Sequence, residues 1–116
     1  VQYTHARACS VLKKAGYVKT TDVDYSLLTD DASVDVCKLI EKYPAKIAEA
    51  AAKYEPSILT RHLVDIAQAF NKFYHDNAIL TSDEKTRNSR LAVVYTVKEV
   101  LSSGLALLGI NAPEQM

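Results

Sequence analysis

The residue types that most often carry catalysis are scattered through this sequence rather than grouped. Its three histidines stand at positions 5, 62 and 75, and none has a second histidine or a carboxylate at a repeated metal-ligand spacing. The sequence also contains no GxGxxG or Walker loop, no GxSxG and no HExxH. We interpret His62 and His75 as surface or helix-end histidines. The sequence therefore predicts no catalytic residue and no metal site.

Tyrosine is the unusual residue of the composition, with seven copies against two phenylalanines and no tryptophan. Its ring has an apolar face and a polar tip, which suits stacking on nucleic-acid bases and equally suits the half-buried edge of a core. For any single tyrosine the core edge is the commoner role. Tyr3 and Arg7 are four residues apart, so on a helix they share a face and together can stack on a base and contact a phosphate.

The balance of charge argues weakly against nucleic acid as a partner. Fourteen basic residues match fourteen acidic ones, whereas a self-sufficient nucleic-acid binder is usually basic. The distribution is uneven, because residues 1–20 hold four basic side chains and no acid, and residues 22–35 hold five aspartates and no base. A local basic face therefore remains open. Cys9 and Cys37 lack the spacing of a zinc or redox motif, so we expect two small buried thiols.

The elements that must position these residues are helices. Only three glycines and three prolines occur, while strong helix formers are abundant, which predicts an all-α fold. Breakers and apolar periodicity place helices at 2–15, 33–44, 44–56, 56–77 and 81–108, with a surface loop at 16–32 and a tail at 110–116. We expect one domain over residues 1–116, an antiparallel bundle of about five helices.

The apolar positions of the middle helices predict their inward faces. The helix at 33–44 repeats apolar residues every three positions, at Val34, Cys37, Ile40 and Tyr43. Pro44 suits the first turn of the following helix. The inward set of that helix is Ile47, Ala48, Ala51 and Tyr54.

The two longest expected helices carry the clearest apolar stripes. The stripe of 56–77 consists of Leu59, Leu63, Ile66, Ala67, Phe70, Phe73, Tyr74 and Asn77. The last helix begins at a capping box, Thr81 to Glu84. Its core face consists of Leu91, Val94, Tyr95, Val97, Leu101, Leu105 and Leu108.

The first expected helix has no Ser, Thr, Asp or Asn at its head to accept its first amide hydrogens. A helix that begins uncapped indicates a truncated start, so we expect a piece of a longer chain. Gly16 and Gly109 stand where C-terminal caps would stand. The sequence has no run of about 18 apolar residues and no signal-peptide series, so we expect a soluble cytoplasmic protein that does not contact membranes.

Three segments carry a resemblance to a known family: VQYTHAR at the start, EPSILTRHLVDIAQAFNKFYHDN at 55–77 and RLAVVYTVKEVLSSGLALLGINAPEQM at 90–116. They resemble the C-terminal anticodon-binding domain of arginyl-tRNA synthetases. The most specific elements are the VQYxHxR opening, the LTRxLxxxAxxFNxFY helix and the LLGIxAPxxM ending, in that order and at suitable distances. The resemblance spans nearly the whole chain.

The resemblance implies a helical bundle that docks on the anticodon stem and loop of arginine tRNA. The family's anticodon-facing positions correspond to Tyr3 and Arg7 on the opening helix, to Tyr74 at the end of FNxFY and to the terminal Met116. The resemblance gives Tyr3, Tyr74 and Met116 the role of stacking or packing on splayed anticodon bases. It gives Arg7 a contact with a phosphate or a base edge.

Two polar residues beside Tyr74 are weaker candidates for RNA contact. Asn71 and Lys72 fall off the apolar stripe of their helix, so we expect neither in the core.

The family's ATP-binding signatures, of the HIGH and KMSK type, belong to a separate catalytic domain, and neither occurs in this sequence. The resemblance implies a non-catalytic, tRNA-binding piece of an arginine–tRNA ligase. It further implies that the parent enzyme uses ATP and Mg²⁺, that this piece holds no cofactor, and that the catalytic domain of the same chain is its partner. The alternative is a protein-interaction bundle whose apolar groove binds a partner helix. The salt dependence of binding separates the two hypotheses. RNA binding should weaken steeply as the salt concentration rises, whereas binding of a helix in an apolar groove should not.

Overall fold

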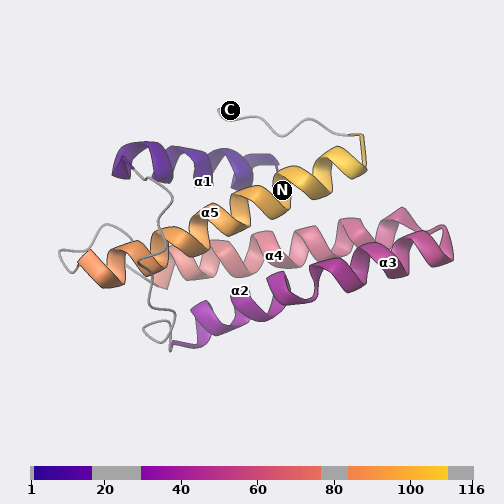
Figure 1. Cartoon of the computed structure of the whole chain (residues 1–116), viewed down its shortest axis with the longest axis horizontal. Helices are drawn as coiled ribbons and strands as arrows, with labels where there is room; N and C mark the ends of the chain where they lie inside the picture. Colours follow the sequence, from indigo (N-terminus) through magenta and orange to yellow (C-terminus); the bar gives the residue numbers. More distant parts are fainter. Residues whose placement is uncertain (1, 17–29, 77–83, 110–116) are drawn as a thin grey trace.

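The computed structural model describes residues 2–16, 30–76 and 84–109. In these ranges it contains no strand and the helices α1 (Gln2–Ala15), α2 (Asp31–Glu41), α3 (Tyr43–Lys53), α4 (Pro56–Asp76) and α5 (Glu84–Leu107). The expected all-α fold is confirmed (Figure 1). Most of the expected loop at 16–32, the tail at 110–116 and the capping residues before Glu84 lie outside the described residues.

Two long antiparallel helices, α4 and α5, form the centre of the bundle (Figure 1). α1 packs chiefly on α5, whereas α2 and α3 follow one another along α4. α2 also touches α5, and the contacts between α1 and α4 are sparser. The expected antiparallel bundle is therefore confirmed, with α1 covering α5 and with α2 and α3 covering α4.

The core lies between α4 and α5 and follows the apolar stripes expected from the sequence. Its largest fully buried apolar side chains are Leu63, Ile66, Phe70 and Phe73 from α4, Val94, Val97 and Leu101 from α5, and Val36 from α2. α1 adds Ala8, Val11 and Leu12. Full burial of one large apolar side chain stabilises the fold by about 1.5–3 kcal/mol, so these stripes supply most of the driving force for packing.

Two glycines end helices where the sequence predicts caps. Gly16 follows α1 with a φ of +61°, and Gly109 follows the end of α5 with a φ of +75°. The amide of Gly16 donates to the carbonyl of Lys13 at 3.2 Å, and that of Gly109 donates to the carbonyl of Ala106 at 3.0 Å. Left-handed backbone of this kind favours glycine, because a residue with a Cβ atom is strained in that conformation.

α2 begins two residues earlier than expected, because Asp30 caps it. The Asp30 carboxylate accepts the amide hydrogen of Ser33 at 3.2 Å and the Ser33 hydroxyl at 2.7 Å. Asp30 itself has extended backbone, which is the normal geometry of an N-cap. The predicted start at Ser33 mistook the residue that the cap binds for the first residue of the helix.

The predicted inward face of α2 is wrong in part: Ile40 and Tyr43 pack against the core as expected, but Cys37 does not. Ala32, Ser33 and Val36 are buried, whereas Cys37 is exposed. A repeat of three residues rotates by about 60° per step around a helix of 3.6 residues per turn, so it drifts off one face. The expectation that Cys37 is a buried thiol fails for the same reason.

α3 is an outer helix and buries less than expected. Pro44 does lie in its first turn, as predicted, and Ile47 packs against the core. Ala48 and Ala51 are exposed, and Tyr54 is 92% exposed beyond the last turn. Tyr54 has a φ of +53° and its amide caps α3 through the carbonyls of Ala50 and Ala51. Because α3 packs almost entirely on α4, only one narrow face of α3 needs to be apolar.

His62 is buried, which contradicts its interpretation as a surface or helix-end histidine. Its side chain on α4 donates from Nε2 to the carbonyl of Leu39 at 2.8 Å and stacks on Tyr43, with ring centroids 6.4 Å apart. The Tyr43 hydroxyl donates in turn to Ser103 on α5 at 3.0 Å. His62 therefore ties the junction of α2 and α3 to the central pair. His75, by contrast, is exposed near the end of α4, as expected.

Protonation of His62 should destabilise the fold. Burial lowers the pKa of His62 below its ordinary value of 6.5, and Lys46 and Lys42 lower it further, against the raising effects of the Leu39 carbonyl and Asp65. The unfolded chain then binds a proton more readily than the folded chain, so the free energy of unfolding is full above pH 6.5 and falls below it. Urea unfolding should show that the cost of His62→Gln is smaller at low pH than at neutral pH. An equal cost at both pH values would contradict this account.

Gly104 lets α5 approach α4 closely. A Cβ atom added there would lie 2.6 Å and 2.7 Å from the two methyl carbons of Leu63. Leu63 is only 1% exposed, so it has little room to move. A glycine inside a helix costs about 1 kcal/mol relative to alanine, and the close approach explains why that cost is accepted here.

Gly104→Ala should lower the free energy of unfolding by about 1–2 kcal/mol, because overpacking of a tight core outweighs the gain in helix propensity. Urea unfolding monitored by circular dichroism measures this change. In a Leu63→Ala background the added methyl has room, so the same substitution should be neutral or stabilising. Stabilisation by Gly104→Ala in the otherwise unchanged chain would show that the contact is not tight.

Candidate nucleic-acid interface

The first turns of α1 hold two of the predicted contact residues on one exposed edge. Tyr3 is 60% exposed, and Arg7, one turn later, is half-buried. The guanidinium carbon of Arg7 lies over the Tyr3 ring at 5.6 Å from its centroid. The opposite face of α1, with Thr4, His5 and Ala8, is buried, which fixes the orientation of the exposed pair.

The last turns of α4 bring the third predicted residue to the same place. Tyr74 is half-buried, and the guanidinium carbon of Arg7 lies 4.8 Å from the centroid of its ring. The fully buried Phe70 lies one turn earlier, with its ring centroid 6.3 Å from that of Tyr74. Phe70 thus supports Tyr74 from the core side. The three residues are called here the Tyr3–Arg7–Tyr74 cluster.

Asn71, a weaker candidate in the sequence, belongs to the cluster. Its side-chain oxygen accepts a hydrogen bond from Nη1 of Arg7 at 3.3 Å. Asn71 and Tyr74 are three residues apart on α4 and so lie on one helix face. That spacing was the available signal, because a side chain from another helix that reaches Tyr74 also comes within reach of Asn71.

The remaining predicted contacts are not placed in the cluster. Lys72 is exposed on α4, and among the described residues it makes no hydrogen bond or cation–ring contact with Tyr3, Arg7 or Tyr74. Met116 lies outside the described residues, so its role stays a prediction.

The cluster combines one cation with two partly exposed aromatic rings. A guanidinium over a ring face is attracted by the ring's quadrupole, and the same geometry suits base stacking. Among the described residues, no carboxylate lies within ion-pair distance of Arg7. Its positive charge is therefore not neutralised by a described neighbour and can attract an anion such as a phosphate.

Other reactive groups in the described part of the chain form no comparable site. Cys9 lies 3.9 Å from the ring nitrogens of the buried His5 on the same helix. The described residues include no group of three His, Cys, Asp or Glu side chains that could hold a metal ion. None of the described helices is both long and apolar enough to cross a membrane.

Comparisons with known proteins agree on one family. The family described as "DALR anticodon binding domain" matches residues 1–116. Among curated relatives, an arginine–tRNA ligase of Alkaliphilus metalliredigens is 58% identical over 116 residues, which is all of this chain and 20% of the relative. An arginine–tRNA ligase of Halothermothrix orenii is 53% identical over the same 116 residues, again 20% of its length.

Solved structures give the same result for the fold. An arginyl-tRNA synthetase of Thermus thermophilus superimposes with a TM-score of 0.89 and 34% identity, over 99% of this chain and 20% of that one. An arginyl-tRNA synthetase of Plasmodium falciparum superimposes with a TM-score of 0.82 at 20% identity, over 98% of this chain and 20% of that one. The chain thus spans about a fifth of the length of these relatives.

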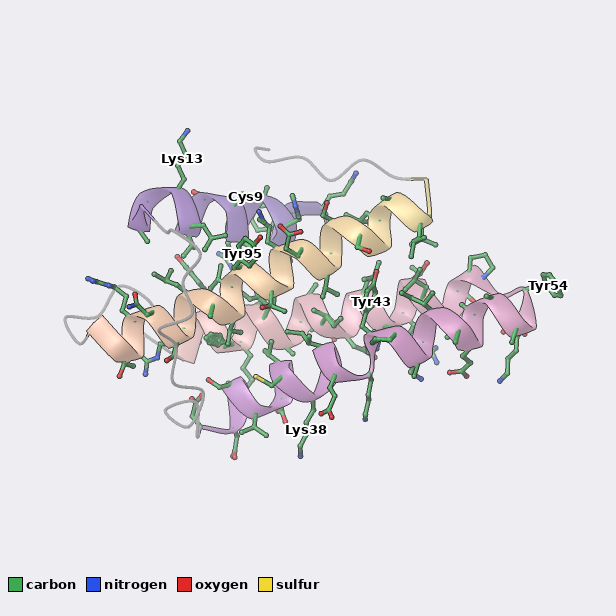
Figure 2. All side chains as sticks on the ribbon, in the orientation of Figure 1. Cys9, Lys13, Lys38, Tyr43, Tyr54 and Tyr95 are labelled. Carbon is green, nitrogen blue, oxygen red and sulfur yellow. The ribbon has the colours of Figure 1, made fainter. Side chains whose placement is uncertain are left out.

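The contact between Arg7 and Tyr74 should be measurable as a coupling energy. A double-mutant cycle of Arg7→Met and Tyr74→Leu, followed by urea unfolding, should give about 1 kcal/mol, because the pair is half-buried. Lys13 points away from the bundle on the same helix (Figure 2). A cycle of Lys13→Met and Tyr74→Leu is therefore the control and should be additive within about 0.3 kcal/mol. Equal values for the two cycles would show that the cation–ring contact contributes nothing.

Proposed function

The chain belongs to the DALR anticodon-binding domain family, and from that membership we propose that it binds the anticodon stem and loop of arginine tRNA. We place the contact at the Tyr3–Arg7–Tyr74 cluster. The observation that carries this proposal is the position of one guanidinium over two partly exposed rings that come from different helices. Such a surface offers an unpaired nucleotide both a ring to stack on and a charge for its phosphate.

Each residue of the cluster has a distinct proposed role. Tyr3 presents the more exposed ring and stacks on a splayed anticodon base. Tyr74, backed by Phe70, gives a second and more rigid ring. Arg7 donates hydrogen bonds to a phosphate or a base edge from a guanidinium that already lies over both rings. In this proposal Met116 packs on the anticodon loop, and the charge of Lys72 attracts the phosphate backbone of the RNA.

The proposal extends to the rest of the protein. Since the chain spans about a fifth of its relatives, we propose that it selects the tRNA for a larger cytoplasmic arginine–tRNA ligase. A catalytic domain in the same protein would then perform the ATP- and Mg²⁺-dependent ligation. The zero net charge of this chain is consistent with this proposal, because basic residues in the other domains can attract the phosphates of the tRNA body.

Binding of the 116-residue chain to an arginine anticodon stem-loop tests the proposal. The comparison is with a stem-loop whose middle anticodon base is replaced, at about 50 mM and about 200 mM salt. Affinity for the first RNA should fall steeply with salt and should exceed affinity for the second. Absence of binding to both would contradict the proposal and favour the protein-interaction alternative.

Substitutions of the rings then locate the contact. Tyr3→Leu and Tyr74→Leu should each weaken binding roughly fivefold to hundredfold, because stacking contributes about 1–3 kcal/mol per base. Tyr54 lies at the far tip where α3 meets α4 (Figure 2) and is the matched exposed tyrosine. Tyr54→Asn, which suits its left-handed backbone, should leave affinity unchanged.

A further inference from the structure

Arg7 is the side chain that connects the two helices of the cluster. It starts on α1, lies over a ring of α1 and a ring of α4, and donates to Asn71 on α4. α1 otherwise rests mainly on α5 and touches α4 less. The position of the guanidinium therefore depends on a small number of contacts, of which the bond to Asn71 is the directional one.

A ring contact and a hydrogen bond constrain an arginine in different ways. The attraction between a cation and a ring face varies little as the guanidinium turns in its own plane. A hydrogen bond to one oxygen requires a particular N–H to point at it. Asn71 therefore determines the rotation of the guanidinium, and hence which N–H groups face away from α4.

The side chain of Asn71 is itself engaged. Its oxygen accepts the Nη1 hydrogen of Arg7 at 3.3 Å, and the residue is half-buried. Lys72, the next residue, is exposed and has no described contact with Arg7. The two polar neighbours are thus placed for different roles, one toward Arg7 and the other toward solvent.

We propose that Asn71 is a positioning residue, which affects RNA binding by orienting Arg7 rather than by contacting RNA. This inference rests on the proposed function, because it concerns the same RNA site. A long side chain loses rotamer freedom when it binds a ligand, and an acceptor that already holds it reduces that loss. Asn71 prepares Arg7 in this way before RNA arrives.

A double-mutant cycle in RNA affinity tests the proposal. Arg7→Met should weaken binding of the arginine anticodon stem-loop about tenfold, and Asn71→Leu about fivefold. In the Arg7→Met chain, Asn71→Leu should change affinity by less than about twofold, because its effect passes through the missing guanidinium. Asn71→Gln keeps an amide oxygen and should lose less affinity than Asn71→Leu. Lys72→Met is the matched control, and its effect should be the same with and without Arg7.

The possible results separate this inference from the proposed function. Equal losses from Asn71→Leu in both backgrounds would mean that Asn71 contacts RNA directly, and would overturn only the inference. No loss from Asn71→Leu in the unsubstituted background would overturn it as well. Failure of the unsubstituted chain to bind RNA would overturn the proposed function and the inference together. Urea unfolding of each variant confirms that the chains compared are folded. Asn71→Ala is a second substitution that also removes the amide, and it should give the same result if Asn71→Leu does not fold.

Discussion

Close packing of α4 on α5 is the constraint on which the other helices depend. Gly104 lacks the Cβ atom that would collide with Leu63, so the two longest helices can approach along their apolar stripes. Phe70 and Phe73 then fill the space between them with no exposed surface. α1 rests on α5, and α2 and α3 rest on α4, so a shift between the central helices would displace both outer layers.

The same packing decides which side chains remain available to a ligand. Phe70 is fully buried, and Tyr74, one turn later on α4, packs against it and is half-buried. On α1, burial of His5 and Ala8 turns Tyr3 and Arg7 outward. The cluster is thus the outer edge of the core, where the helix faces change from apolar to polar. Its positive charge is local, since the chain as a whole is neutral.

Patterns with helical spacing predicted the long elements well, and local chemistry explains where they failed. The stripe of α4 from Leu59 to Tyr74 and that of α5 are confirmed, because a helix covered on two sides needs many apolar residues in register. Asn77, the last residue of the predicted stripe of 56–77, lies outside the described residues. α2 and α3 are outer helices, so each needs only a few apolar residues to pack against the central pair. The spacing of so few apolar residues does not define the buried face of a helix. Periodicity also carries no information about partners, so the burial of His62 against Leu39 was missed. The spacing of Tyr3 and Arg7 already paired them on one helix face, and the resemblance added Tyr74. The convergence of both rings on one guanidinium could be seen only in the fold.

The hydrogen bond between Arg7 and Asn71 joins residues that are 64 positions apart. Bringing them together closes a loop of more than half the chain, which costs more conformational entropy than a contact within one helix. No isolated helix of this bundle can reproduce the cluster, because its residues come from both α1 and α4. The surface therefore exists only where α1 is packed against α4, and a ligand that binds it shifts the folding equilibrium toward chains in which these helices are packed.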